Sequence, residues 1–173
     1  QALGATFYDD EAQIVDMRKG AYLIKYIRRI DLSGVHPQLT KVNIQLMSDF
    51  SSRLYGKKSE IMQTYESLDL SQNEAAEIDN LIWYFSELFK NELKIAMGPI
   101  ERGGAGGGIA AVLNSLYQAE ILTSHELVNQ ITHLENLIQQ ADLIIFGEGL
   151  KEEDQILETT TIRIAELTQQ YSK

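Results

Sequence analysis

The chain has 173 residues, of which 44% are hydrophobic and 23% are charged, and this balance predicts that residues 1–173 form a single folded domain. Its formal net charge of −10 argues against a nucleic-acid partner, because binding a polyanion depends on clustered lysine and arginine. There is no cysteine, which excludes disulfides and thiolate metal sites and fits the cytoplasm, and no apolar run approaches the length of a membrane span.

The first part of the chain predicts short strands followed by a helix. Gln1 to Gly4 has the pattern of a last helical turn that ends at a left-handed glycine. Ala5–Tyr8 is a strand candidate, and Ile14–Asp16 is a possible return strand after a polar turn. Arg18–Arg29 has apolar residues at helical spacing and is expected to form a helix. Because the chain begins without a methionine and stops directly after another predicted helix, we expect it to be part of a longer protein.

A second strand is predicted before a polar stretch that could contribute to a site. Val42–Met47 alternates apolar and polar residues, which is typical of a half-buried strand. Ser48–Ser52 follows it directly, and ligands of α/β sheets are bound at such strand ends. Asp49 is therefore a candidate catalytic residue, although an ordinary loop aspartate would give the same pattern. Ser59–Tyr65 is a weak helix candidate.

The strongest helix signal begins at Ser71. Ser71 and Glu74 form a capping-box pattern, and apolar residues keep helical spacing as far as Leu93. Trp83 lies off this apolar stripe, where it could meet a neighbouring protein or simply be a partly exposed aromatic residue.

A glycine-rich loop directly before a helix is the most distinctive stretch of the sequence. Five glycines occupy six positions, interrupted only by an alanine: Gly103, Gly104, Ala105, Gly106, Gly107 and Gly108. A glycine loop that feeds a helix N-terminus can hold a phosphate or a carboxylate, because the first helical amides lack partners and carry the positive end of the dipole. A flexible linker or close helix packing would also explain the glycines. The pattern matches neither a P-loop nor a dinucleotide fingerprint.

The remaining elements alternate helices with one strongly apolar strand. Ile109 to Leu116 has one apolar helical face, and a second capping box at Thr123 and Glu126 opens a helix or helix pair that extends to Ile138. Leu143–Phe146 has the apolar run of a buried central strand, and Asp154–Tyr171 predicts a last helix. Strands alternating with helices favour the α/β class, with a layered sheet that carries helices on its faces.

A second candidate site follows the apolar run. Glu148 stands between Gly147 and Gly149, so its carboxylate is expected at the sheet edge with unhindered backbone on both sides. A strand-to-helix turn with a surface glutamate is the alternative. If residues 48–52, 102–108 and 147–149 meet at one edge, they form an anion-binding cleft whose carboxylates suit Mg²⁺ or a hydroxyl proton. The three histidines show no metal-ligand spacing.

Several segments together resemble the bacterial glycerate kinases of the glycerate 2-kinase type. The resemblance covers nearly the whole chain and rests on the order and spacing of four stretches, which are Ala2–Phe7, Ile30–Gly34 with Pro37–Leu39, Gly104–Ile109, and Ala141–Gly149.

The resemblance implies an ATP-dependent kinase that phosphorylates D-glycerate, or a similar small carboxylate, to phosphoglycerate. It implies two α/β domains with the active site between them, and it makes this chain the middle domain of a longer protein whose remaining part is missing here. By position, residues 103–108 with Gly147 and Gly149 would bind the substrate or its phosphate. Glu148 would be a catalytic residue and Mg²⁺ ligand, and Asp49 stands where the family has a site aspartate.

The chain also differs from the family pattern. Ser52-Arg53-Leu54 stands in place of Asn-Pro-Leu, and Tyr65–Leu70 lacks a family lysine. Phosphoryl transfer depends on charge neutralisation and positioning. One alternative is therefore a catalytically silent homologue that binds a small carboxylate or a phosphorylated ligand. Another is an assembly domain with its interface around Trp83.

Overall fold

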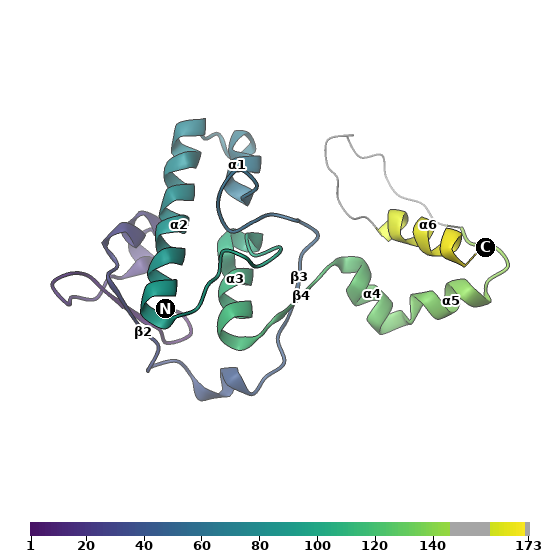
Figure 1. The fold of residues 1–173 in the computed structure, drawn as a ribbon, viewed down its shortest axis with the longest axis horizontal. Coiled ribbons are helices and arrows are strands. Elements are labelled where there is room, and N and C mark those ends of the chain that lie inside the picture. The colour runs from purple at the N-terminus through teal and green to yellow at the C-terminus, as the bar shows by residue number, and fades with distance from the viewer. Residues whose placement is uncertain (146–159, 172–173) are drawn as a thin grey trace. The chain divides into compact units, whose positions relative to one another are not determined.

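The computed structural model describes residues 1–145 and 160–171, which form two compact units (Figure 1). Unit 1 consists of Gln1–Ile44 and Ser51–Glu120, and unit 2 of Gln45–Phe50 and Ile121–Lys173. Helices and short strands follow one another along the chain, so the predicted mixed α/β class is confirmed. The sheets are small, because each of the two in the described residues has only two strands.

The first sheet of unit 1 joins β1 (Thr6–Tyr8) to β2 (Arg29–Asp31) in antiparallel register, with Phe7 opposite Ile30. The strand predicted at Ala5–Tyr8 is thus confirmed. Before it, the amide of Gly4 donates to the carbonyl of Gln1 at 2.8 Å, and Gly4 has the positive φ expected of it, at 102°. The return strand predicted at Ile14–Asp16 is reduced to a single bridge between Ile14 and Tyr8.

The helix predicted over Arg18–Arg29 is wrong. Two short 3₁₀ helices, η1 (Met17–Lys19) and η2 (Ala21–Tyr26), stand there instead, and β2 begins at Arg29. Gly20 separates the 3₁₀ helices at a φ of 137°, a value that no right-handed helix contains. The amide of Arg28 donates to the carbonyl of Tyr8 at 2.7 Å, so pairing with β1 draws the end of the segment into the sheet.

Between η3 (Pro37–Thr40) and the glycine-rich loop, unit 1 contains three helical elements: α1 (Glu60–Thr64), η4 (Tyr65–Leu68) and α2 (Gln72–Leu93). The helix predicted from Ser59 and the long helix from Ser71 are both confirmed, the second with its complete capping box. The side-chain hydrogen bond from Ser71 lowers the pKa of the Glu74 carboxyl, as expected where the ionised form closes the cap. Helix α2 ends at Lys94, whose φ is 61°.

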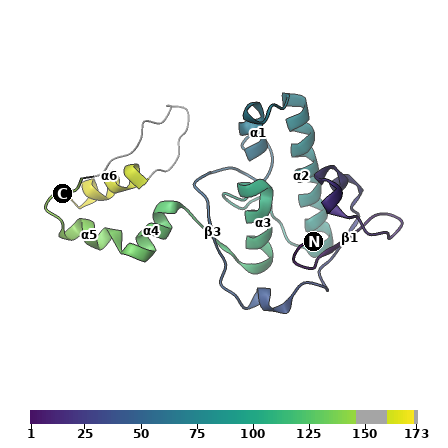
Figure 2. The same ribbon diagram turned by 180° about the vertical axis from the view of Figure 1, so that it is seen from behind.

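The core of unit 1 lies where α2 packs on η2 and β2 (Figures 1 and 2), and α1 contacts α2 without contributing to this core. Ile27 and Met97 are fully buried there, and Phe85 meets the ring of Phe7 edge-on with centroids 5.8 Å apart. The Tyr84 hydroxyl donates to the carbonyl of Ile27 at 2.6 Å. This hydrogen bond satisfies a polar group beside the buried Ile27 side chain and fixes α2 on the segment before β2.

Unit 2 is built from helices next to the second sheet. Strand β3 (Gln45–Met47) pairs with β4 (Glu120–Leu122), so the strand predicted at Val42–Met47 forms only in its second half, and β4 was not predicted. The capping box at Thr123 is complete, and the predicted helix pair is confirmed as α4 (Ser124–Thr132) and α5 (Leu134–Gln140). His133, with a φ of 52°, joins the two helices.

The end of unit 2 departs from the sequence prediction. Residues 143–145 form no strand, and the Leu143 and Ile145 side chains are 76% and 87% exposed, so the central strand predicted there is wrong for these residues. An apolar run becomes a central strand only when strands pair with it on both sides, and no such partners stand beside it in the described chain. Phe146 lies outside the described residues. Of the helix predicted at Asp154–Tyr171, α6 (Thr160–Gln170) is described.

Candidate functional site

The glycine loop, residues 103–108, opens helix α3 (Ala105–Tyr117) through an abrupt change of backbone hand. Gly104 is right-handed, with φ −73° and ψ −17°, whereas Gly106, Gly107 and Gly108 are left-handed, with φ of 61°, 68° and 99°. Three consecutive left-handed residues are a conformation that side chains with a Cβ oppose. The helix is regular only beyond Gly108 and ends at Gln118, whose φ is 56°. The predicted loop-to-helix transition is confirmed.

Gly104 is fixed by contact rather than by backbone hand. Its amide donates to the carbonyl of Ser52 at 3.2 Å, and a Cβ built on it would collide with the main-chain carbonyl of Arg53. The same Cβ would stand 2.9 Å from the Ser52 hydroxyl oxygen, which is buried and has no hydrogen-bond partner among the described residues. The segment before Leu54 and the start of the loop are therefore packed backbone against backbone.

Most hydrogen bonds donated by the loop amides go to main-chain carbonyls. Gly103 donates to Ile100 at 3.2 Å, Ala105 to Arg102 at 3.1 Å and Gly108 to Gly104 at 3.1 Å. The amide of Gly107 differs, because it donates to a carboxylate oxygen, Glu60 Oε2, at 3.3 Å. The loop therefore already binds one anion, and that anion belongs to the protein.

A set of hydrogen bonds fixes the start of α1, where Glu60 is the first residue. Ser59 caps α1 through a side-chain oxygen that accepts from the amide of Met62 at 3.4 Å. The Ser59 hydroxyl donates to Asp79 Oδ1 at 2.6 Å, and the amide of Gly56 donates to the same carboxylate at 2.8 and 3.0 Å. Asp79 lies on α2, so this carboxylate anchors the turn from which α1, and with it Glu60, projects.

Two cavities border the glycine loop within unit 1. The first, which we call the loop cavity, has a volume of about 430 Å³. Gly104 and Gly107 line it together with α1, η4 and α2, and its other polar lining residues are Glu60, Thr64 and Ser67. A pocket that joins main-chain glycines to a carboxylate and two hydroxyl-bearing residues suits a small polar ligand.

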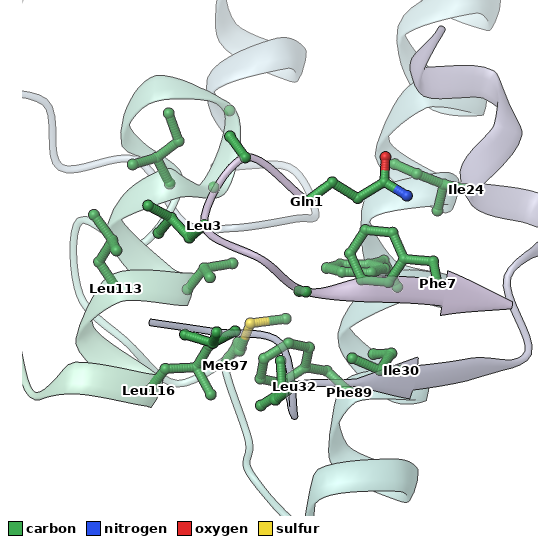
Figure 3. Close-up of a pocket in the computed structure, with 18 of the residues that line it drawn as sticks. Gln1, Leu3, Phe7, Ile24, Ile30, Leu32, Phe89, Met97, Leu113 and Leu116 are labelled. Carbon is green, nitrogen blue, oxygen red and sulfur yellow. The ribbon is translucent and has the colours of Figure 1, made fainter. Parts of the chain in front are cut away.

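The second cavity, which we call the apolar cavity, has a volume of about 460 Å³ and is lined by Gly107 and Gly108 on the side of the loop. Figure 3 shows other residues that line it. Aliphatic and aromatic side chains from the N-terminal turn, both strands of the first sheet, α2 and α3 line it; those that Figure 3 labels include Leu3, Phe7, Ile30, Leu32, Phe89, Met97, Leu113 and Leu116. Such a lining favours an apolar occupant.

The other predicted site residues lie elsewhere. Asp49 is in unit 2, where its Oδ1 accepts a hydrogen bond from the amide of Ser124, the first residue of α4, at 2.7 Å. This bond satisfies a helix N-terminal amide and gives Asp49 a structural role in the unit. Gly147, Glu148 and Gly149 lie outside the described residues. Of the predicted site residues, the structure therefore describes residues 103–108 in unit 1 and Asp49 in unit 2.

Glu60 and Asp79 were not predicted from the sequence. Glu60 has only the ordinary signal of an acidic residue in the first turn of a helix. Its contact with Gly107 spans 47 residues of sequence, and Asp79 meets Gly56 across 23, so neither contact leaves a local pattern.

In the described part of the chain, no group of three or more His, Asp or Glu side chains comes together as a metal site would require. No helix within residues 1–145 or 160–171 is long and apolar enough to cross a membrane.

Comparisons with known proteins agree along the whole chain. The model of the glycerate kinase family matches residues 1–173. The chain is similar to a glycerate kinase from Halalkalibacterium halodurans, with 28% identity over 99% of the chain and 44% of the relative. It is similar to glycerate 2-kinase from Escherichia coli K12, with 27% identity over 100% and 45%. A crystal structure described as a glycerate kinase 2 from Salmonella typhimurium LT2 superimposes with a TM-score of 0.81 at 26% identity, over 100% of this chain and 46% of that one. The chain therefore spans less than half the length of the relatives it matches.

Proposed function

Since the chain belongs to the glycerate kinase family, we propose that it forms part of a kinase that transfers the γ-phosphoryl group of ATP to a hydroxyl of D-glycerate, giving phosphoglycerate and ADP. The hydroxyl loses its proton to a protein carboxylate. We place this activity in the cytoplasm, in agreement with the absence of cysteine from the sequence.

The observation that carries the proposal is the hydrogen bond between the amide of Gly107 and the Glu60 carboxylate. It supports a role of the glycine loop as a main-chain donor for an anion next to the loop cavity. D-Glycerate has a carboxylate, and its product has a phosphate as well, so residues 103–108 would hold one of these groups. Phosphoryl transfer relies on positioning and charge stabilisation, which main-chain amides can supply.

We propose that carboxylates outside the glycine loop bind Mg²⁺ and accept the proton. Mg²⁺ bound to a nucleotide needs only one or two protein carboxylates in addition to the phosphates. Glu148 is proposed as such a ligand, with Gly147 and Gly149 beside the phosphate. Asp49 is proposed to accept the hydroxyl proton through Oδ2, because Oδ1 is engaged by the amide of Ser124.

The test is a coupled ATP assay with D-glycerate on the full-length parent protein and its Asp49→Asn variant. Asparagine keeps an oxygen that can accept from the amide of Ser124 but has no basicity. We expect kcat to fall by about 10² to 10⁴-fold with an unchanged melting temperature. Asp142→Asn, at an exposed position of the same unit, should leave kcat unchanged. A variant with full kcat would leave Asp49 with its helix-capping role alone.

The silent-homologue alternative predicts a different result in the same assay. It expects a full-length protein that binds phosphoglycerate, with a raised melting temperature at millimolar ligand, but shows no turnover above background. All the relatives reported above are described as kinases, which favours the active form.

We also propose that unit 1 associates with the remaining part of a full-length kinase through the apolar cavity. The relatives contain more than half of their length beyond the region matched here. A cavity of about 460 Å³ lined by aliphatic and aromatic side chains is a surface that such a segment would cover. The stabilisation would come mainly from removing this apolar area from water.

This association can be measured by producing the two parts of the kinase as separate chains and following their complex by size-exclusion chromatography. Leu113→Asn, in the apolar cavity, is expected to weaken the complex by about tenfold or more. Trp83→Ser changes a 48% exposed side chain outside this cavity and should have no effect. If Trp83→Ser dissociates the complex and Leu113→Asn does not, the interface lies around Trp83, as the assembly hypothesis expects. Thermal denaturation checks that both variants fold.

A further inference from the structure

Glu60 occupies the place at which the glycine loop would meet an external anion. Its Oε2 is 3.3 Å from the Gly107 amide nitrogen, and both residues line the loop cavity. The Glu60 side chain is only half-buried, so it can leave this position without breaking the core. Glu60 therefore has the charge of the expected ligand, accepts from the same amide donor and has a side chain that can move away.

The lining of the loop cavity contains no positive charge to offset a second anion. Among the described residues that line it there is no lysine or arginine, and all of them except Glu60 are uncharged. Two anions that share one amide repel each other, and an anion entering the cavity must either displace Glu60 or bind against its field. In both cases the affinity for the external anion falls.

Asp79 keeps Glu60 near the loop without contacting Gly107 itself. It binds Gly56 and the Ser59 hydroxyl directly before α1, which fixes where the helix begins. The Glu60 carboxylate therefore stays close to the Gly107 amide even when the hydrogen bond between them is broken. Its effective concentration there is high, as for any tethered competitor.

We propose that Glu60 is an internal competitor that lowers the affinity of the glycine loop for a small carboxylate or phosphate. The inference rests on the proposed function of this loop as an anion site. It adds a specificity-determining residue: only an anion that binds Gly107 and its neighbours more strongly than the tethered carboxylate is retained.

The experiment titrates the 173-residue chain with inorganic phosphate, and separately with D-glycerate, while the amide resonance of Gly107 is followed by NMR. In Glu60→Ala the apparent Kd should fall by about 5- to 10-fold, because the competitor is removed. Glu60→Gln retains an acceptor oxygen without the charge and should give a smaller decrease. Glu77→Gln removes a charge from an exposed position on α2 and is the matched control, with no expected change.

Each outcome decides between distinct explanations. Suppose that the unsubstituted chain binds phosphate and that Glu60→Ala binds it equally or more weakly. Glu60 then has a structural or preorganising role, and the inference is wrong while the proposed function stands. If neither the parent nor any variant shifts the Gly107 resonance with either ligand, the loop is not an anion site, and the proposed function fails together with the inference.

Discussion

Gly104→Ala is expected to lower the free energy of unfolding by about 2 to 3 kcal/mol, whereas Gly107→Ala should lower it by only about 1 kcal/mol. The two glycines lie in one loop but are required for different reasons. A Cβ at Gly104 would collide with the main-chain carbonyl of Arg53, and main chain cannot move aside as a flexible side chain can. A Cβ at Gly107 meets nothing within 4 Å and costs only the left-handed conformation at a φ of 68°.

Urea denaturation followed by circular dichroism measures both variants. The m-value should stay the same, since neither change alters the surface exposed on unfolding. Anion affinity should also differ between the two variants. Gly107→Ala keeps the amide that binds the anion, whereas Gly104→Ala moves the loop away from Ser52 and should bind the anion more weakly. Equal destabilisation by the two substitutions would contradict the packing described for Gly104.

The second large effect is expected at Asp79, where alanine should lower the free energy of unfolding by about 3 kcal/mol. The substitution leaves the Gly56 amide without its acceptor and the buried Ser59 hydroxyl without the partner that it reaches at 2.6 Å. An unsatisfied buried donor costs more than the net strength of the bond that it loses. The start of α1 should loosen, and with it the contact between Glu60 and Gly107.

Asn80→Ala is the control for this prediction, because Asn80 is the exposed neighbour of Asp79 on α2. The loss of stability in Asp79→Asn should lie between those of Asp79→Ala and Asn80→Ala, since one amide oxygen replaces a carboxylate that accepts from two groups. Hydrogen exchange provides a second readout: in Asp79→Ala the amides of residues 56–62 should lose protection more than those of α2. If protection there is unchanged, Asp79 does not anchor the turn.

The sequence predicted best where local chemistry decides the structure. The boxes at Ser71 and Thr123 place both acceptors within three residues of the donors that they satisfy, so the starts of α2 and α4 could be read directly. The glycine loop was also recognisable, because three successive left-handed residues need glycine almost regardless of the fold.

Long-range pairing accounts for what the sequence could not predict. The segment before Arg29 has helical spacing, but hydrogen bonds to β1 made its end a strand. Leu143 and Ile145 have the apolar character of a central strand, which is not sufficient without neighbouring strands. In the site, Glu60 reaches Gly107 only through the packing of α1 against α3, and no spacing rule contains that contact.

Three helices, α2, α3 and α4, end at Lys94, Gln118 and His133, each of which adopts a positive φ without being glycine. A left-handed residue with a Cβ carries strain of about 1 kcal/mol that glycine avoids. The chain is thus less thermostable than its own architecture allows. These three residues line neither cavity and lie outside the glycine loop. Replacing them with glycine should therefore raise thermal stability without changing ligand binding.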